Sequence, residues 1–292
     1  MNPRVLGIIG GSGLYDIEMF NDVELVDVET PWGKPSSKLT IAKLGDLNIY
    51  FISRHGTEHN IAPSKINYRA NIYALKKYGV TDIVSFSAVG SLDDSIHPGM
   101  LVISDQFIDK TYKRCNTFFD ADMVAHVSMA MPVSQTLSSE CEKVVKKLKY
   151  KYKYATTYVA IEGPQFSTYA ESKMFKSLGG HVIGMTNMPE AKLAREAEIR
   201  YATIGMVTDY DCYKYEYMDV DIGKMIEILH ENVKKAKALI PLLADSLNNN
   251  NIPNDPISVC LDTAIITNLN KVNKKTKDML GLIIKRYEKD NK

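Results

Sequence analysis

The chain has 292 residues, of which 45% are hydrophobic and 24% are charged. This composition is typical of globular proteins and excludes disordered, collagen-like and coiled-coil chains. The 36 basic and 35 acidic residues leave a net charge of +1, which provides no overall field for holding nucleic acid or an anionic membrane.

Strands and helices are predicted to alternate along most of the chain, as in an α/β protein with a parallel or mixed sheet. Apolar β-branched runs predict strands at 5–9, 39–44, 48–53, 82–86, 100–108, 156–162, 181–185 and 200–209. Helical periodicity and capping residues predict helices at 63–78, 136–149, 170–178, 189–197 and 219–247, with a helical tail after 256.

No Pro/Gly/Ser-rich linker divides the chain, so we expect one domain over 1–292 with a helical C-terminal part from about 219. The asparagine run 248–251 predicts a surface loop. The Lys- and Tyr-rich segment 146–154 favours a solvated helix end leading into an edge strand over an RNA-binding patch.

Four separated cysteines lack zinc-ligand spacing, and no apolar run is long enough for a membrane span. The N-terminal residues do not resemble a signal peptide. We therefore expect a cytosolic protein with reduced thiols; access to the nucleus remains open.

Three short polar motifs follow predicted strands: 10–13 (Gly-Gly-Ser-Gly), 53–56 (Ser-Arg-His-Gly) and 85–91. Glycines let backbone N–H groups approach an anion, and a guanidinium suits phosphate oxygens. Each motif alone is also compatible with a tight turn, and His55 could be an acid, a base or a buried structural residue. Since ligands bind at the carboxyl ends of strands in α/β folds, the three together favour a shared anion pocket.

Two further motifs could contact a planar ligand or act as a proton donor and acceptor. Gly163-Pro164 makes a sharp turn that presents Phe166, either to the core or to a planar ligand. Asp209 and Asp211 follow a buried strand at a spacing of two, so their carboxyl groups can point the same way and divide into a protonated acid and an ionised acceptor. A metal site lacks further ligands at suitable spacing, and a structural turn remains an alternative.

The order of these motifs resembles the purine nucleoside phosphorylase family from about residue 5 to 245, and most of all its members that act on 5′-methylthioadenosine. The segments that carry the resemblance are 10–14, 54–56, 63–68, 87–92, 98–99, 105–109, 162–167, 185–186, 189–190 and 208–212. The resemblance implies a distorted β-barrel core wrapped by helices and a homotrimer with shared active sites. It implies conversion of 5′-methylthioadenosine and phosphate to adenine and 5-methylthioribose 1-phosphate, with phosphate as co-substrate and no metal or cofactor.

The resemblance also implies roles for individual residues. Asp209 and His55 would be catalytic, with Asp209 at N7 of the base and Asp211 at the 6-amino group. The expected phosphate ligands are Ser12, Arg54, His55, Ser87, the Ala88 backbone and Thr186. Met185 would contact the ribose, and the base pocket would include Phe166, Ser167 and Tyr210. The pocket for the 5′-substituent would contain Ile222 and Met225, together with His126 and Met131 from a neighbouring subunit.

Three positions depart from the family pattern. Serine replaces the usual threonine at 12 and 87, and Asn187 stands where threonine is usual. Relatives that act on 6-oxopurines carry Asn at the position of Asp209, so Asp209 favours 6-aminopurines. The alternatives are a broader adenosine or 2′-deoxyadenosine phosphorylase, a 5′-methylthioinosine phosphorylase, and a non-catalytic nucleoside-binding protein. Intact Arg54, His55, Asp209 and Asp211 argue against the last.

Overall fold

The computed structural model describes residues 4–290, apart from 12–13, 15–21, 46, 218–221, 250–252 and 254. The strands in this part of the chain form one mixed sheet with the order β2-β3-β4-β1-β5-β8-β7-β6-β9. Their bounds are β1 Leu6–Gly10, β2 Val23–Val26, β3 Leu39–Leu44, β4 Leu47–Ser53, β5 Asp82–Ser91, β6 Leu101–Asp109, β7 Tyr152–Ala160, β8 Val182–Gly184 and β9 Arg200–Tyr210.

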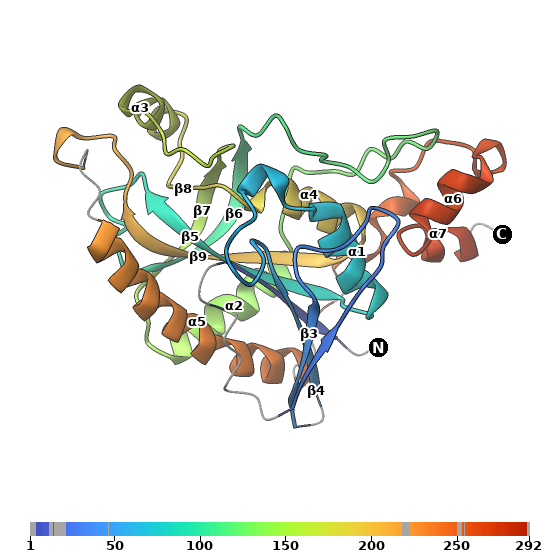
Figure 1. Ribbon diagram of the computed structural model, residues 1–292, viewed down its shortest axis with the longest axis horizontal. Coiled ribbons are helices and arrows are strands. Elements are labelled where there is room, and N and C mark those ends of the chain that lie inside the picture. The colour runs from blue at the N-terminus through green and yellow to red at the C-terminus, as the bar shows by residue number, and fades with distance from the viewer. Residues whose placement is uncertain are drawn as a thin grey trace.

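The sheet closes into a barrel because β9, at the end of the order, pairs again with β5. The β5–β9 ladder is parallel and runs from Asp82 opposite Arg200 to Ser91 opposite Tyr210. Strands β1 to β4 continue the sheet outward as an arm, seen in blue below the barrel in Figure 1. This arrangement confirms the predicted α/β class with a mixed, barrel-like core.

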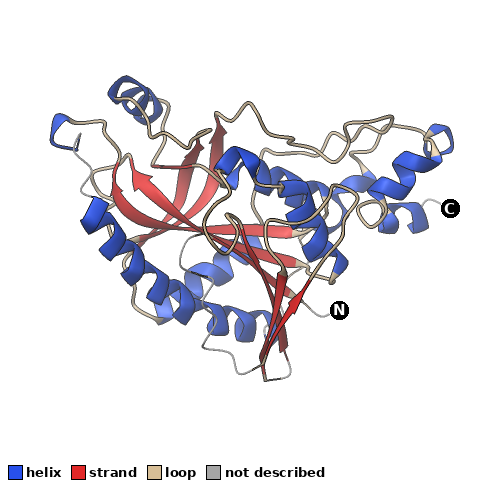
Figure 2. Cartoon of the chain, in the orientation of Figure 1, coloured by secondary structure: helices blue, strands red, loops and turns tan. Residues whose placement is uncertain are grey.

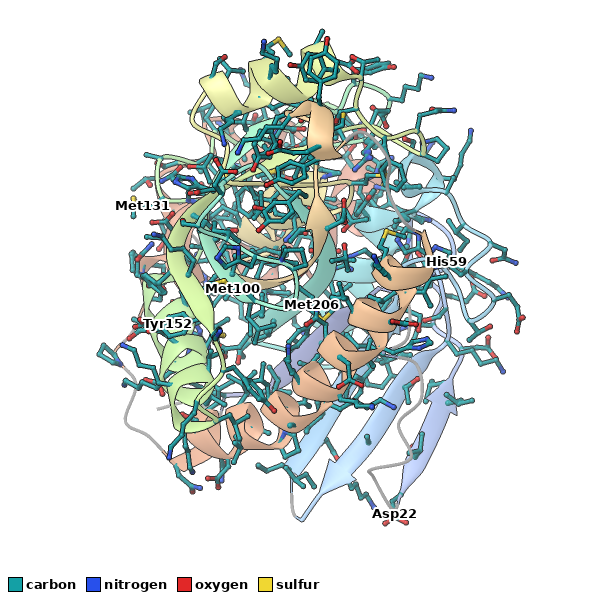
Figure 3. The ribbon with its side chains drawn as sticks, turned by 90° about the vertical axis from the view of Figure 1, so that its left-hand side faces the viewer. Asp22, His59, Met100, Met131, Tyr152 and Met206 are labelled. Carbon is teal, nitrogen blue, oxygen red and sulfur yellow. The ribbon has the colours of Figure 1, made fainter. Side chains whose placement is uncertain are left out.

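Helices cover the barrel, as the blue ribbons around the red strands in Figure 2 show. They are α1 Tyr68–Lys77, α2 Gln135–Lys147, α3 Tyr169–Ser177, α4 Asn187–Glu196, α5 Ile222–Asn249, α6 Lys274–Leu280 and α7 Lys285–Asp290. Helices α2 and α5 pack against each other and against β9, and Figure 3 shows them crossing on one face of the sheet. Their apolar sides share a buried cluster with β1, β5 and β9, while α1 and α4 bury a second cluster.

The structure corrects three predicted boundaries. The helix predicted at 63–78 divides, because Pro63–Lys65 forms a separate 3₁₀ turn and α1 begins only after Asn67. The strand predicted to end at Phe86 continues through Ser91, because β9 pairs with its whole length. Asn248 and Asn249 extend α5 instead of forming a loop, and Asn250 and Asn251 lie outside the described residues.

Asn67 fixes the start of α1 by two kinds of hydrogen bond. Its Oδ1 accepts from the Ala70 N–H at 3.2 Å, and its Nδ2 donates to the Trp32 carbonyl at 2.7 Å. We expect Asn67→Ala to lower the free energy of unfolding by about 1–2 kcal/mol, because both a cap and a tertiary bond are lost. Asn67→Ser retains the cap and should lose less in the same denaturant titration; equal losses would show that the cap contributes nothing.

The C-terminal tail is helical, as predicted, and holds a long loop between β6 and α2. A 3₁₀ helix at Pro256–Asp262 precedes α6 and α7. Ala125 forms an isolated bridge with Ile265, and the His126 N–H donates to the Ala264 carbonyl at 2.8 Å. Among the described helices, none combines the length and the apolar character needed to cross a bilayer.

Candidate functional site

Arg54 follows β4 and is completely buried. Its Nε and Nη2 form a two-pronged ion pair with Glu190 of α4, at 2.7 and 3.0 Å. Nη2 also donates to Ser85 Oγ at 2.6 Å, and Nη1 donates to the Phe86 carbonyl at 2.9 Å. Nη2 also lies 3.3 Å from the Ile9 carbonyl, and among the residues that the structure describes only the Phe86 carbonyl accepts from Nη1, which carries two N–H groups.

The glycine-rich loop after β1 meets Arg54. The Arg54 N–H donates to the Gly10 carbonyl at 3.0 Å, and a Cβ placed on Gly11 would lie 3.8 Å from Arg54 Nη1. The structure therefore brings two of the predicted anion-binding motifs together. The predicted ligand Ser12 and its neighbour Gly13 lie outside the described residues.

His55 is buried beside Arg54, with its Nδ1 2.8 Å from the Ile61 carbonyl. Because a carbonyl can only accept, Nδ1 carries a proton and donates it. Burial lowers the pKa of His55 to about 4, and the nearby Arg54 charge acts in the same direction. His55 is therefore neutral at physiological pH, and its Nε2 is an acceptor.

Ser87, Ala88 and Thr186 lie on the elements that flank Arg54. Ser87 and Ala88 belong to β5 itself, and Thr186 immediately precedes α4, which also carries Glu190. Ser87 and Thr186 are buried, whereas Ala88 is exposed. Met185, the predicted ribose contact, is half-buried next to Thr186. The Arg54 partners Ser85 and Phe86 precede Ser87 on the same strand, so the anion-site predictions converge on one region.

Tyr158 of β7 belongs to this region but was not predicted from the sequence. It is completely buried, and its hydroxyl has no hydrogen-bond partner among the described residues. Burial raises the pKa of Tyr158, and the neighbouring Thr186 and Ser87 oppose that rise. A Cβ on Gly184 would overlap the Tyr158 hydroxyl, so the glycine makes room for it. The sequence carried a signal only in this glycine, which ends the short strand β8.

Asp209 and Asp211 both lie against Gly90 of β5, as their spacing predicts. A Cβ on Gly90 would lie 3.5 Å from Asp209 Oδ2 and 3.6 Å from the Asp211 Cβ. Thr208 Oγ1 donates to Asp209 Oδ1 at 2.6 Å. Burial raises the pKa of Asp209 to about 6; the Thr208 hydrogen bond opposes this shift, and the charge of Asp211 adds to it. Burial also raises the pKa of Asp211, whose Oδ2 has no partner in the part of the chain described.

Only some of the predicted base-pocket residues lie near Asp209 and Asp211. The Cys212 thiol, next to Asp211, donates to the Ser167 carbonyl at 3.2 Å, which places Ser167 near the aspartates. Phe166 is 65% exposed and is therefore not a core residue. Tyr210 is the last residue of β9, next to Asp209 on the alternating strand; it stacks on Tyr217 and contacts His97 through its hydroxyl. The structure thus does not place Tyr210 with the aspartates.

The described residues of the predicted 5′-substituent pocket differ in exposure. His126 is exposed, and Met131 is 50% exposed at the outer edge of the molecule in Figure 3. Met225 is half-buried near the start of α5, and the Ile222 side chain lies outside what is described. Within the described chain, no hydrogen bond joins these residues to Arg54 or the aspartates.

Arg114 connects the segment at Glu162 with the segment at 185–188. It was not predicted from the sequence. Its guanidinium donates to the carbonyls of Met185 and Met188, at 2.6 and 2.5 Å. It also donates to the Glu162 carbonyl at 2.8 Å and pairs with the Glu162 carboxylate at 3.1 Å. Hydrogen bonds from Ser64, the Tyr112 and Lys113 N–H groups and Arg114 outweigh burial and lower the pKa of Glu162 to about 2.

Comparison with known proteins gives consistent matches over most of the chain. The family model of the Phosphorylase superfamily matches residues 5–242. The S-methyl-5′-thioadenosine phosphorylase of Rhodospirillum rubrum is 48% identical over 92% of each chain, and that of Geobacter sulfurreducens is 45% identical over 97% of this chain and 99% of its own.

Solved structures agree with the sequence relatives. A methylthioadenosine phosphorylase from an antarctic soil metagenomic library superposes with a TM-score of 0.91 at 40% identity, covering 97% of this chain and 99% of its own. The methylthioadenosine phosphorylase of Schistosoma mansoni in complex with adenine gives 0.81 at 34% identity, covering 85% and 93%.

Proposed function

Because the chain belongs to the Phosphorylase superfamily, we propose that it is a pentosyltransferase that cleaves 5′-methylthioadenosine with inorganic phosphate. The products are adenine and 5-methylthioribose 1-phosphate, as in salvage of purines and of the methylthio group. One observation supports the proposal. Ser87, which is buried near Arg54, lies on β5, and Asp209, whose pKa is raised, lies on the paired strand β9.

Phosphate would bind at the region formed by Arg54, Ser87, the Ala88 backbone and Thr186, with Ser12 contributing from the glycine loop. The remaining Arg54 N–H supplies a charge-assisted hydrogen bond that Glu190 keeps in place. His55 is held neutral, so its Nε2 accepts a hydrogen bond from a phosphate or ribose hydroxyl.

The reaction breaks the bond between C1′ of the sugar and N9 of adenine. Positive charge develops on the sugar and negative charge on the base, and a phosphate oxygen forms the new bond to C1′. Holding phosphate under C1′ in the correct orientation can supply about 7–11 kcal/mol of the barrier reduction. Protonated Asp209 donates its proton to N7 as the base leaves, and Asp211 accepts a hydrogen bond from the 6-amino group.

Adenine release should require phosphate. We expect the purified protein to release adenine from 5′-methylthioadenosine only when phosphate or arsenate is present, because the site holds an anion as the nucleophile. Chromatography of the base with and without the anion measures this. Equal release in its absence would identify a hydrolase, and no release would favour a binding protein. Adenosine, 2′-deoxyadenosine and 5′-methylthioinosine as parallel substrates separate the narrow activity from the broader alternatives.

We further propose a cytosolic homotrimer in which each active site receives His126 and Met131 from a neighbouring chain. The exposure of both side chains supports this assignment. His126→Ala should raise the KM for 5′-methylthioadenosine about tenfold, the effect of losing one polar contact, with little change in the KM for phosphate. The matched control is His230→Ala, an exposed histidine on α5. A fully active monomer in light scattering would contradict the shared site.

A further inference from the structure

A continuous buried relay joins Arg54 to Ser87 through three intervening side chains, none of the five more than 4% exposed. Glu190 Oε1 accepts from Arg54 and from the Tyr201 hydroxyl, the latter at 2.9 Å. Asn187 Nδ2 lies 3.1 Å from the Tyr201 hydroxyl, and Asn187 Oδ1 lies 3.0 Å from Ser87 Oγ. The elements involved, β5, β9 and α4, pack together at the centre of Figure 1.

The direction of every hydrogen bond in this relay follows from its charged end. Glu190 is a carboxylate paired with a guanidinium, so it can only accept, and Tyr201 must donate its one proton to it. Burial raises the pKa of Tyr201 well above its usual value, which keeps that proton in place. The Tyr201 oxygen can then only accept, so the partner it faces must be the NH₂ of Asn187.

The orientation of the Asn187 side-chain amide determines whether Ser87 Oγ donates or accepts. With its NH₂ turned to Tyr201, and a second N–H bonded to Thr203, Asn187 presents its carbonyl oxygen to Ser87. A carbonyl oxygen cannot donate, so the serine must give it the only hydroxyl proton. Toward any other partner, Ser87 Oγ has lone pairs and no proton.

We propose that Asn187 is a positioning residue that makes Ser87 a hydrogen-bond acceptor toward the anion, so that the site selects an anion carrying a proton. Inorganic phosphate retains at least one P–OH group at neutral pH, whereas the sulfate dianion retains none. The P–OH would donate to Ser87, and a different, unprotonated oxygen would remain to attack C1′. This inference rests on the proposed phosphorolysis, since it assumes that the anion at Ser87 is the co-substrate.

The test compares the affinities of inorganic phosphate and sulfate for the whole protein by calorimetry at neutral pH. We expect Ser87→Ala to reduce the preference for phosphate over sulfate about tenfold or more, because one hydrogen bond to a charged ligand is lost while sulfate loses none. Ser138→Ala removes another buried serine hydroxyl, on α2 and outside the relay, and should leave the ratio unchanged.

A second variant separates positioning from simple contact. In Asn187→Thr, the threonine hydroxyl can donate or accept, so Ser87 can turn its proton toward the pocket. We expect sulfate to bind more tightly and the preference for phosphate to fall, with Ser87 still present. An unchanged ratio in either Ser87→Ala or Asn187→Thr overturns the proposal. The proposal is also overturned if Tyr158→Phe loses the preference for phosphate over sulfate and Ser87→Ala retains it. In that case the Tyr158 hydroxyl would discriminate between the two anions.

Phosphate-dependent adenine release by the unmodified protein is measured on the same preparations. If release does not depend on phosphate, the proposed function fails first. If it does depend on phosphate and the ratio stays constant in the variants, only the role of Asn187 and Ser87 fails.

Discussion

Asp209→Asn is expected to lower kcat for 5′-methylthioadenosine about 100-fold or more, the scale of losing a positioned general acid. Asparagine has nearly the same size and can donate a hydrogen bond to N7, but it cannot transfer a proton. Activity on 6-oxopurine nucleosides should fall less, or rise, because the family resemblance places Asn at this position in relatives that act on 6-oxopurines. Steady-state kinetics on both substrate classes measures the difference.

The same variant should be more stable than the parent protein at pH 7. A folded-state pKa near 6 lies about 2 units above the ordinary value of 3.8, so the folded state binds more protons and loses stability as the pH rises from about 4 to about 6. Removing the buried carboxylate should therefore restore up to about 3 kcal/mol above pH 6 and nothing below pH 4. Unchanged kinetics in a folded variant would reduce Asp209 to a turn residue.

Arg54→Ala should damage both phosphate binding and folding. The substitution leaves Glu190 as an unpaired buried carboxylate, which costs about 3–5 kcal/mol of unfolding free energy. It also removes the charged donor of the anion region, so the KM for phosphate should rise and kcat should fall. Denaturant titration and phosphate kinetics on the same preparation measure the two effects.

The double variant Arg54→Met with Glu190→Leu separates these effects, because it removes both charges of the pair. It should regain at least part of the lost stability, as buried ion pairs replaced by apolar residues often do, without regaining phosphate binding. If the double variant recovers the original KM for phosphate, Arg54 serves only the fold.

The sequence predicted the barrel strands well, because apolar β-branched runs mark buried strands wherever they pair. It also placed Asp209 and Asp211 on one side, since that follows from spacing alone. It could not show that Arg54 forms a two-pronged ion pair with Glu190, 136 residues away, because this pairing depends on how α4 packs on the sheet. Tyr158 was missed for the same reason: its hydroxyl meets the anion region only through closure of the barrel.

The β5–β9 ladder fixes the distance between the position of Ser87 and that of Asp209. Gly90 pairs with Asp209, and Ser87 stands three residues earlier on the same strand, a separation of about 10 Å along the strand. Backbone hydrogen bonds set this interval, so flexing side chains cannot shorten it appreciably. We expect a purine nucleoside with phosphate beneath its sugar to span this gap, and the smaller ring of a pyrimidine not to reach Asp209. We therefore expect pyrimidine nucleosides to be poor substrates, because the length of the sheet between Ser87 and Asp209 is fixed.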